Sequence, residues 1–407
     1  MAWQDRESVL QRMEEVLNGI VYSRVESVGT VVPFGSWVAG LHTPAGDVDL
    51  SLEGTLSWRA GLFGQHSTGD AKYLTKAEKI DVLKACCRAL PQYVMRRLLS
   101  EGIPRGRVEC VWTARIPIIK FTDAETGLHV DLSVDGRAPL FRSTLLGQLQ
   151  RLDWRVGALV RLVKQWASAV GISGAADGML SSHALTLMVI WHLQMRVPAV
   201  LPPVGESFDS RPLEAGADPD MPLVQQSCRR LYSMRTLGTF SCVNGETLAE
   251  LLFSFFSAWR GLLEAWLEDE SGQARFVRAS IWHGGLCMDD GWRGRGYLFA
   301  IEEPTDAMDN VARSVRSVQA ARRIAAAFRQ ADHCMTQEAC DQQGVAEALR
   351  QLFGEDACRS SGALGELESG TKPPVRMGSV FLTHGMVSKL SRVSMPESAV
   401  VGHTRRR

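Results

Sequence analysis

The sequence predicts an α+β fold in which a sheet-containing domain is followed by a mainly helical domain. In residues 1–138, short segments that are apolar or alternate with period two lie between helical segments and turn residues, which is typical of a mixed sheet with helices. After Pro139, apolar residues recur at helical spacing and strand signals are few. The length of 407 residues predicts two or three domains rather than one and is sufficient for a sizeable core.

The first domain is predicted to begin with an amphipathic helix over residues 1–20, because apolar side chains recur there at helical spacing. The long segment between the second and third predicted strands leaves room for an inserted subdomain over about 55–105. The other elements expected in this domain are strands over 27–34, 46–53, 108–120 and 128–134 and a helix over 76–101.

The second domain is predicted to cover residues 139–353. From residue 354 onward, Gly, Ser and Pro accumulate and the periodicity is lost, which predicts a poorly ordered tail over 354–407. Helices are expected in the second domain over 159–170, 181–196, 222–234, 247–267 and 311–330.

Composition excludes several classes of protein. The 45 Lys and Arg residues balance 45 Asp and Glu residues, which argues against nucleic-acid binding by bulk positive charge but is compatible with a local basic groove. A hydrophobic fraction of 45% excludes disorder as the main state, and no apolar run approaches the length of about 18 residues typical of a membrane span. Nine cysteines without C-x-x-C spacing and an N-terminus without a clear targeting peptide predict an intracellular protein with reduced thiols.

Paired carboxylates give the strongest local signal. Asp47 and Asp49 lie two residues apart on a predicted strand, so both side chains project from one face. Adjacent carboxylates repel each other unless a cation lies between them, and Mg²⁺ prefers carboxylate oxygens. Asp131 lies in another apolar strand, where a carboxylate is costly unless a metal or partner satisfies it. Three acids on neighbouring strands can hold two metal ions about 4 Å apart, as in in-line attack on a phosphate.

Gly35 and Ser36 fit the same chemistry. A glycine in a turn lets backbone N–H groups approach a triphosphate closely, and the serine hydroxyl adds a donor. The alternative interpretation is a turn glycine with a capping serine and two surface aspartates. The combination of this dipeptide with both aspartates and the later Asp131 disfavours that alternative.

Five ordered motifs between about residues 27 and 325 resemble the terminal uridylyltransferases and the related cytoplasmic-type poly(A) polymerases, within the polymerase-beta-type nucleotidyltransferases. The resemblance implies a nucleotidyltransferase palm followed by a helical domain with a poly(A)-polymerase-associated segment at about 245–325. The motifs read FGSWVAGLHTPAGDVDLSLEG, ARIPIIKF with LHVDLSV, LVRLVKQWASAVGI, GMLSSHALTLMVIWHLQ, and LAELLFSFFSAW with IEEPTDAMDNVAR.

The resemblance assigns Asp47 and Asp49 to metal and triphosphate binding and Asp131 to activation of an RNA 3′-hydroxyl, with two Mg²⁺ or Mn²⁺ ions as cofactors. Carboxylates at the base edge can accept from uracil N3–H, which would favour UTP. The other positions implied in nucleotide binding are Gly35 and Ser36 at the β- and γ-phosphates, Lys164 and Ser182 at the triphosphate, Ser143 beside the ribose, and Glu303 and Asp306 at the base edge.

Several positions depart from the family pattern. Arg142 replaces an Asn near the ribose 2′-hydroxyl, and His183 replaces the Tyr that stacks on the base, although an imidazole can still stack. Asp309 stands where some uridylating enzymes have His. Because all three metal-binding aspartates are present, the resemblance implies intact catalysis with a less secure choice between UTP and ATP.

Arg115 and Lys120 are the predicted RNA contacts. They flank the strand that leads to Asp131, within a basic stretch at 93–121 that has interleaved aromatic rings and suits single-stranded RNA. A solvated helix face with core aromatics explains most of this stretch equally well. The insert at about 55–105 is expected to tune RNA binding.

The resemblance therefore implies an RNA uridylyltransferase that adds UMP from UTP, without a template, to single-stranded RNA 3′ ends. The compact size resembles the minimal RNA uridylyltransferases of kinetoplastid protists, which implies RNA processing, a partner complex and a mitochondrial location, with the cytoplasm as the alternative. No membrane partner is expected. Two alternatives stay open: a poly(A) polymerase that uses ATP, and a non-catalytic RNA-binding scaffold.

Overall fold

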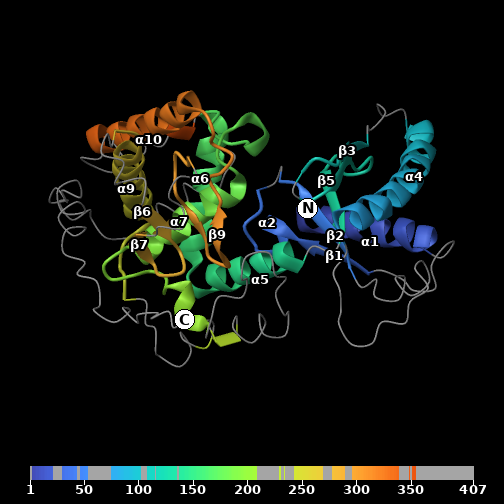
Figure 1. Ribbon diagram of the computed structural model, residues 1–407, viewed down its shortest axis with the longest axis horizontal. Coiled ribbons are helices and arrows are strands. Elements are labelled where there is room, and N and C mark those ends of the chain that lie inside the picture. The colour runs from blue at the N-terminus through green and yellow to red at the C-terminus, as the bar shows by residue number, and fades with distance from the viewer. Residues whose placement is uncertain are drawn as a thin grey trace, which may run out of the picture.

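The computed structural model has two parts joined by a short helix and a longer one (Figure 1). The sheet and its helices α1 and α4 lie on one side and helices α6, α7, α9 and α10 on the other, with α2 and α5 between them. The structure describes residues 2–21, 30–43, 46–53, 75–101, 108–114, 116–134, 137–208, 243–268, 277–288 and 296–338, with short pieces at 229–230, 233, 348 and 351–353.

A five-stranded mixed sheet organises the first part. Its spatial order is β1-β2-β5-β4-β3, and all neighbours are antiparallel except β2 and β5, which run parallel. The predicted α+β fold is therefore confirmed. The strands are β1 (Thr30–Phe34), β2 (Val48–Glu53), β3 (Glu109–Val111), β4 (Ile118–Thr122) and β5 (His129–Val134).

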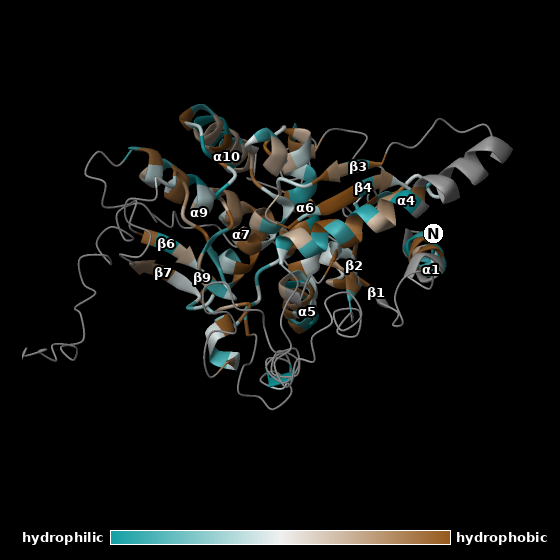
Figure 2. Cartoon of the chain, turned by 45° about the vertical axis from the view of Figure 1, so that its right-hand side comes forward, coloured by the Kyte–Doolittle hydropathy of each residue, from teal (hydrophilic) through white to brown (hydrophobic). Residues whose placement is uncertain are grey.

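Helices α1 (Ala2–Val21) and α4 (Lys76–Glu101) cover this sheet. Val9, Met13 and Leu17 of α1 share one apolar stripe and are buried together with Leu83 of α4 and the inward-facing residues of the strands. Strand β4 is mostly hydrophobic in Figure 2, whereas α4 alternates between hydrophobic and hydrophilic residues, as expected for a helix with one face in the core. Helix α4 thus belongs to the core of the sheet domain, although it lies in the range predicted as an insert.

The prediction of one strand over 108–120 is wrong, because the chain forms the two antiparallel strands β3 and β4 there. Pro117 lies between them and lacks the N–H that a continuous strand would need. The helix predicted over 311–330 begins later, as α10 (Val318–Glu338), because β9 (Asp306–Asn310) and a turn come first.

Helix α5 (Arg137–Leu152) connects the two parts. It packs against α2 (Gly35–Val38) on the sheet side and against α6 (Trp154–Ala169) on the helical side. No element was predicted over this range, which has Pro139 in its first turn. Proline is tolerated in the first turn of a helix, where the backbone N–H has no intrahelical partner.

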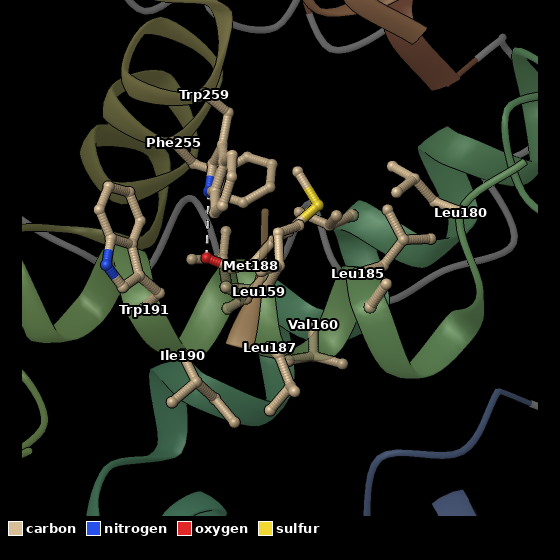
Figure 3. Close-up of a cluster of buried hydrophobic side chains, with 14 of the residues drawn as sticks. Leu159, Val160, Leu180, Leu185, Leu187, Met188, Ile190, Trp191, Phe255 and Trp259 are labelled. Atoms are coloured by element: carbon tan, nitrogen blue, oxygen red, sulfur yellow. Dashed lines mark hydrogen bonds between the residues drawn. The ribbon is translucent and has the colours of Figure 1, made fainter. Parts of the chain in front are cut away.

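The helical part has one continuous core. Helix α7 (Ser182–Gln194) is buried on nearly all sides between α6 and α9 (Leu248–Glu268). Figure 3 shows this packing, in which the Trp259 indole N–H donates to the Met188 carbonyl oxygen at 3.1 Å. The described residues of this part also form two hairpins: β6 (Val277–Ser280) pairs with β7 (Gly285–Met288), and β8 (Glu302–Glu303) pairs with β9.

Some predictions lie outside the described residues: most of the helix at 222–234, the start of the insert at 54–74, and the tail at 354–407. Within the part of the chain that the structure describes, no helix is long and apolar enough to cross a membrane.

Candidate functional site

The register of the sheet brings the three predicted aspartates to one edge. Asp49 of β2 pairs directly with Asp131 of β5 across the parallel ladder, although the two residues are far apart in the sequence. Asp47 immediately precedes β2 and projects from the same face as Asp49, because side chains alternate along a strand. The fold therefore brings Asp47, Asp49 and Asp131 together as a cluster of three carboxylates.

Gly35 leaves the space that this cluster needs. Its φ of +74° lies in the left-handed region, and a Cβ placed there would lie 1.9 Å from Asp49 Oδ2. The Gly35 N–H donates to the Ser143 hydroxyl oxygen at 2.7 Å, and this hydroxyl donates to the Pro139 carbonyl oxygen at 2.8 Å. Ser143 is thus buried and holds the turn that carries Gly35 and Ser36, and its hydroxyl is already engaged at the position predicted to lie beside a ribose.

The carboxylates affect each other's ionisation. Burial and the neighbouring Asp131 and Asp47 carboxylates together raise the pKa of Asp49 to about 7. Burial and the Asp131 carboxylate also raise the pKa of Asp47. Neighbouring anions without a cation between them produce shifts in this direction.

Lys120 is part of this cluster. The register of β4 against β5 places it opposite Asp131, and its Nζ lies 2.6 Å from Asp131 Oδ2. Burial opposes the charged form, but the hydrogen bond to Asp131 raises the pKa of Lys120 overall. Lys120, predicted as an RNA contact, thus contacts the Asp131 carboxylate in this structure, while Arg115 lies outside the described residues.

The donor set fits divalent metal ions. Among the described residues, no three acidic, His or Cys side chains converge closely enough to enclose one ion, and Lys120 engages one oxygen of Asp131. However, burial and the neighbouring Asp131 and Asp47 carboxylates raise the pKa of Asp49, so a cation placed among these anions would be stabilised, and carboxylate oxygens are the ligands that Mg²⁺ prefers. Asp47, Asp49 and Asp131 are the residues that would hold the metal.

Lys164 of α6 faces the same cluster from the helical side. Its Nζ donates to the Leu41 carbonyl oxygen at 3.4 Å, and burial lowers its pKa to about 8 although the Asp49 carboxylate opposes this shift. Ser182 is exposed at the first turn of α7, directly after the N-cap residue Ser181. Lys164 is therefore a cation next to the aspartates, as its predicted role at a triphosphate requires.

The residues predicted at the base are already linked to one another. The Glu303 carboxylate is buried and contacts His183 Nε2 at 2.7 Å and Arg142 Nε at 3.3 Å through the same oxygen, Oε2. Burial opposes its ionisation, yet Arg142 and His183 hold the pKa of Glu303 well below its usual range. Asp306 is also buried and accepts from the Met308 backbone N–H at 2.9 Å.

Arg6 is a site residue that the motifs did not reveal. Its fully buried guanidinium donates to the carbonyl oxygens of Thr43 and Gly46 at 3.1 and 2.7 Å, and Gly46 immediately precedes Asp47. Helix α1 thus braces the turn that leads into the carboxylate cluster. A signal was present in the sequence, because Arg6 interrupts the apolar stripe of α1 that continues with Val9 and Met13.

Comparisons with known proteins show which chains share this fold. Residues 2–151 match the family described as the central palm domain of mitochondrial-like poly(A) RNA polymerase. The crystal structure of the Cid1 poly(U) polymerase is similar with a TM-score of 0.57 and 21% identity, covering 82% of this chain and 88% of that chain. The structure of mtPAP in complex with ATPγS has a TM-score of 0.61 and 21% identity, covering 86% of this chain and 68% of that chain. This chain therefore has the same fold as the Cid1 and mtPAP structures.

Curated relatives extend the similarity. Protein HESO1 of Arabidopsis thaliana is 28% identical over 319 residues, which are 76% of this chain and 56% of HESO1. The speckle targeted PIP5K1A-regulated poly(A) polymerase of Homo sapiens is 36% identical over 222 residues, which are 53% of this chain and 24% of that protein. The chain thus spans about half the length of the first relative and a quarter of the second.

Proposed function

We propose that this protein is a metal-dependent RNA 3′-terminal nucleotidyltransferase that adds UMP from UTP to single-stranded RNA without a template. The observation that carries the proposal is the in-register pair of Asp49 and Asp131, with Asp47 beside them and Gly35 leaving the space against Asp49. Carboxylates next to a glycine turn and a buried lysine provide sites for metal ions and for a triphosphate.

In the proposed reaction, the oxygen of the RNA 3′-hydroxyl attacks the α-phosphorus of the triphosphate, the bond from that phosphorus to the β-phosphate oxygen breaks, and pyrophosphate leaves. Asp131 receives the hydroxyl proton, and Lys120 orients the Asp131 carboxylate. Lys164 and the backbone at Gly35 and Ser36 bind the phosphates. When bound at the aspartates, two Mg²⁺ or Mn²⁺ ions would supply positive charge at the phosphate.

The uridylyl assignment rests on the base-side residues and on the resemblance to uridylating enzymes, including the minimal kinetoplastid ones. The same resemblance suggests a role in an RNA-processing complex inside the cell, in the mitochondrion or the cytoplasm. ATP is the second candidate substrate, because position 309 is Asp and because poly(A) polymerases are among the relatives.

A primer-extension assay tests the proposal. Purified protein is incubated with a short single-stranded RNA, Mg²⁺ or Mn²⁺, and each ribonucleoside triphosphate separately. We expect extension with UTP that is lost in Asp47→Ala and Asp131→Ala. A lack of extension with every triphosphate would favour the non-catalytic scaffold, whereas a preference for ATP would refute only the uridylyl assignment.

A further inference from the structure

Two buried acids on the β8–β9 hairpin share one arginine from another element. Glu303 and Asp309 are 1% and 6% exposed. Arg142 of α5 lies between them, with its Nε 3.3 Å from Glu303 Oε2 and its Nη2 3.5 Å from Asp309 Oδ2. Arg142 is therefore the charged link between α5 and the hairpin.

The other contacts of the two acids occupy much of their capacity to accept hydrogen bonds. Glu303 Oε1 accepts from the Thr305 hydroxyl at 3.0 Å, and Glu303 Oε2 contacts His183 Nε2 at 2.7 Å. Asp309 Oδ1 pairs with Arg313 Nη1 at 2.5 Å. A base that used Glu303 as its acceptor would have to displace a contact of a buried carboxylate, which is costly.

Arg142 has donors beyond those directed at the two acids. A guanidinium carries five N–H donors and no acceptor. The ion pairs of Arg142 with Glu303 and Asp309 are formed by Nε and Nη2. The side chain is 19% exposed, unlike the acids that it contacts. A ligand that contacts the exposed part of Arg142 can therefore accept hydrogen bonds from a positively charged guanidinium.

Ser143, the residue after Arg142, connects the surroundings of Arg142 to the turn at Gly35 that is proposed to bind phosphate. Ser143 follows Arg142 on α5 and accepts from the Gly35 N–H at 2.7 Å. Two consecutive residues of one helix thus contact the glycine turn and the β8–β9 hairpin. A rigid helical turn of this kind fixes the distance between the phosphate-binding turn and Arg142.

We propose that Arg142 is the residue that determines base choice, by donating hydrogen bonds to the carbonyl oxygens of the incoming pyrimidine. This inference rests on the proposed nucleotidyl transfer and deepens it. Uracil O4 accepts a hydrogen bond, whereas the N6 amino group at the corresponding position of adenine is a donor, and a guanidinium has no acceptor for it. Glu303 and Asp309 then act as positioning residues that hold Arg142 in place.

Two variants distinguish recognition of the base by Arg142 from a role of Arg142 only in holding the β8–β9 hairpin against α5. Arg142→Lys keeps the positive charge between the acids but loses the planar array of donors. The double variant Arg142→Met with Asp309→Asn removes one cation and one anion, which limits the uncompensated buried charge. Arg313→Gln is the matched control, because it removes the other cation from Asp309 at a side chain that is 45% exposed. Thermal denaturation establishes that each variant is folded.

The measurements are kcat/KM for UTP and ATP on the same RNA primer, and equilibrium binding of each triphosphate with Mg²⁺ in the absence of RNA. We expect the UTP-to-ATP ratio to fall about tenfold or more in both Arg142 variants, the scale of one lost hydrogen bond to a charged group, and to stay unchanged in Arg313→Gln. An unchanged ratio in folded Arg142 variants, or an equal loss for both triphosphates, would overturn the inference.

The two proposals fail in different ways. If no triphosphate is incorporated, nucleotidyl transfer is refuted, and the binding ratio alone decides the role of Arg142. If the unmodified protein binds and incorporates ATP better than UTP, nucleotidyl transfer stands and the proposed recognition of a pyrimidine by Arg142 is refuted.

Discussion

Replacing Asp49 by Asn should stabilise the metal-free protein while abolishing its activity. Burial and two neighbouring carboxylates raise the pKa of Asp49 from 3.8 to about 7. The folded protein therefore binds this proton more tightly than the unfolded chain, so ionisation of Asp49 opposes folding. The cost starts when the pH rises above about 4 and is complete above about 7.

The magnitude follows from the same shift. A rise of about three pKa units corresponds to about 4 kcal/mol at about 1.4 kcal/mol per unit, which is an upper value for the free energy of unfolding regained in Asp49→Asn. The amide has the same shape as the carboxylate and carries no charge. The gain should be largest at pH 8 and should vanish towards pH 4.

Thermal and urea denaturation of both proteins at pH 8 and pH 5, each with EDTA or with Mg²⁺, measure this effect. We expect Asp49→Asn to be more stable than the original protein at pH 8 in EDTA, and Mg²⁺ to stabilise only the original protein strongly. Asp123→Asn is the matched control, because this buried carboxylate is bonded to Arg12 at 2.7 Å and its loss should destabilise the fold. If Asp49→Asn were no more stable at pH 8 without metal, the electrostatic reasoning would be refuted.

Three further substitutions test the site. Gly35→Ala should lower kcat at least about 100-fold by displacing Asp49, because its φ is +74° and its Cβ would overlap Asp49 Oδ2, and unchanged extension kinetics would contradict this. Arg6→Gln should lower kcat about tenfold through the turn before the aspartates, whereas Arg12→Gln on the same helix should lower only the melting temperature. Binding of UTP should weaken as the pH rises through about 8, where Lys164 loses its proton, and Lys164→Met should bind UTP weakly at every pH, as measured by calorimetry.

The sequence allowed the secondary structure to be predicted well where periodicity reports burial. The alternating pattern around Asp49 and the apolar run around Asp131 appear as β2 and β5, because a strand with one or two buried faces must place apolar side chains at fixed intervals. Helix α5 and the β8–β9 hairpin were not predicted. Proline obscures the start of α5, and strands as short as β8 carry too few residues to show a period.

What the sequence alone determined is the chemical inventory: two aspartates on one strand face, a third in a neighbouring apolar strand, and a glycine-serine turn. These follow from local spacing, which depends only on the geometry of a strand or helix. The tertiary structure decided the contacts between distant residues. Lys120 donates a hydrogen bond to the Asp131 carboxylate, and Arg142 lies between Glu303 and Asp309. Strand register and helix packing set those contacts, and neither is encoded in any single local pattern.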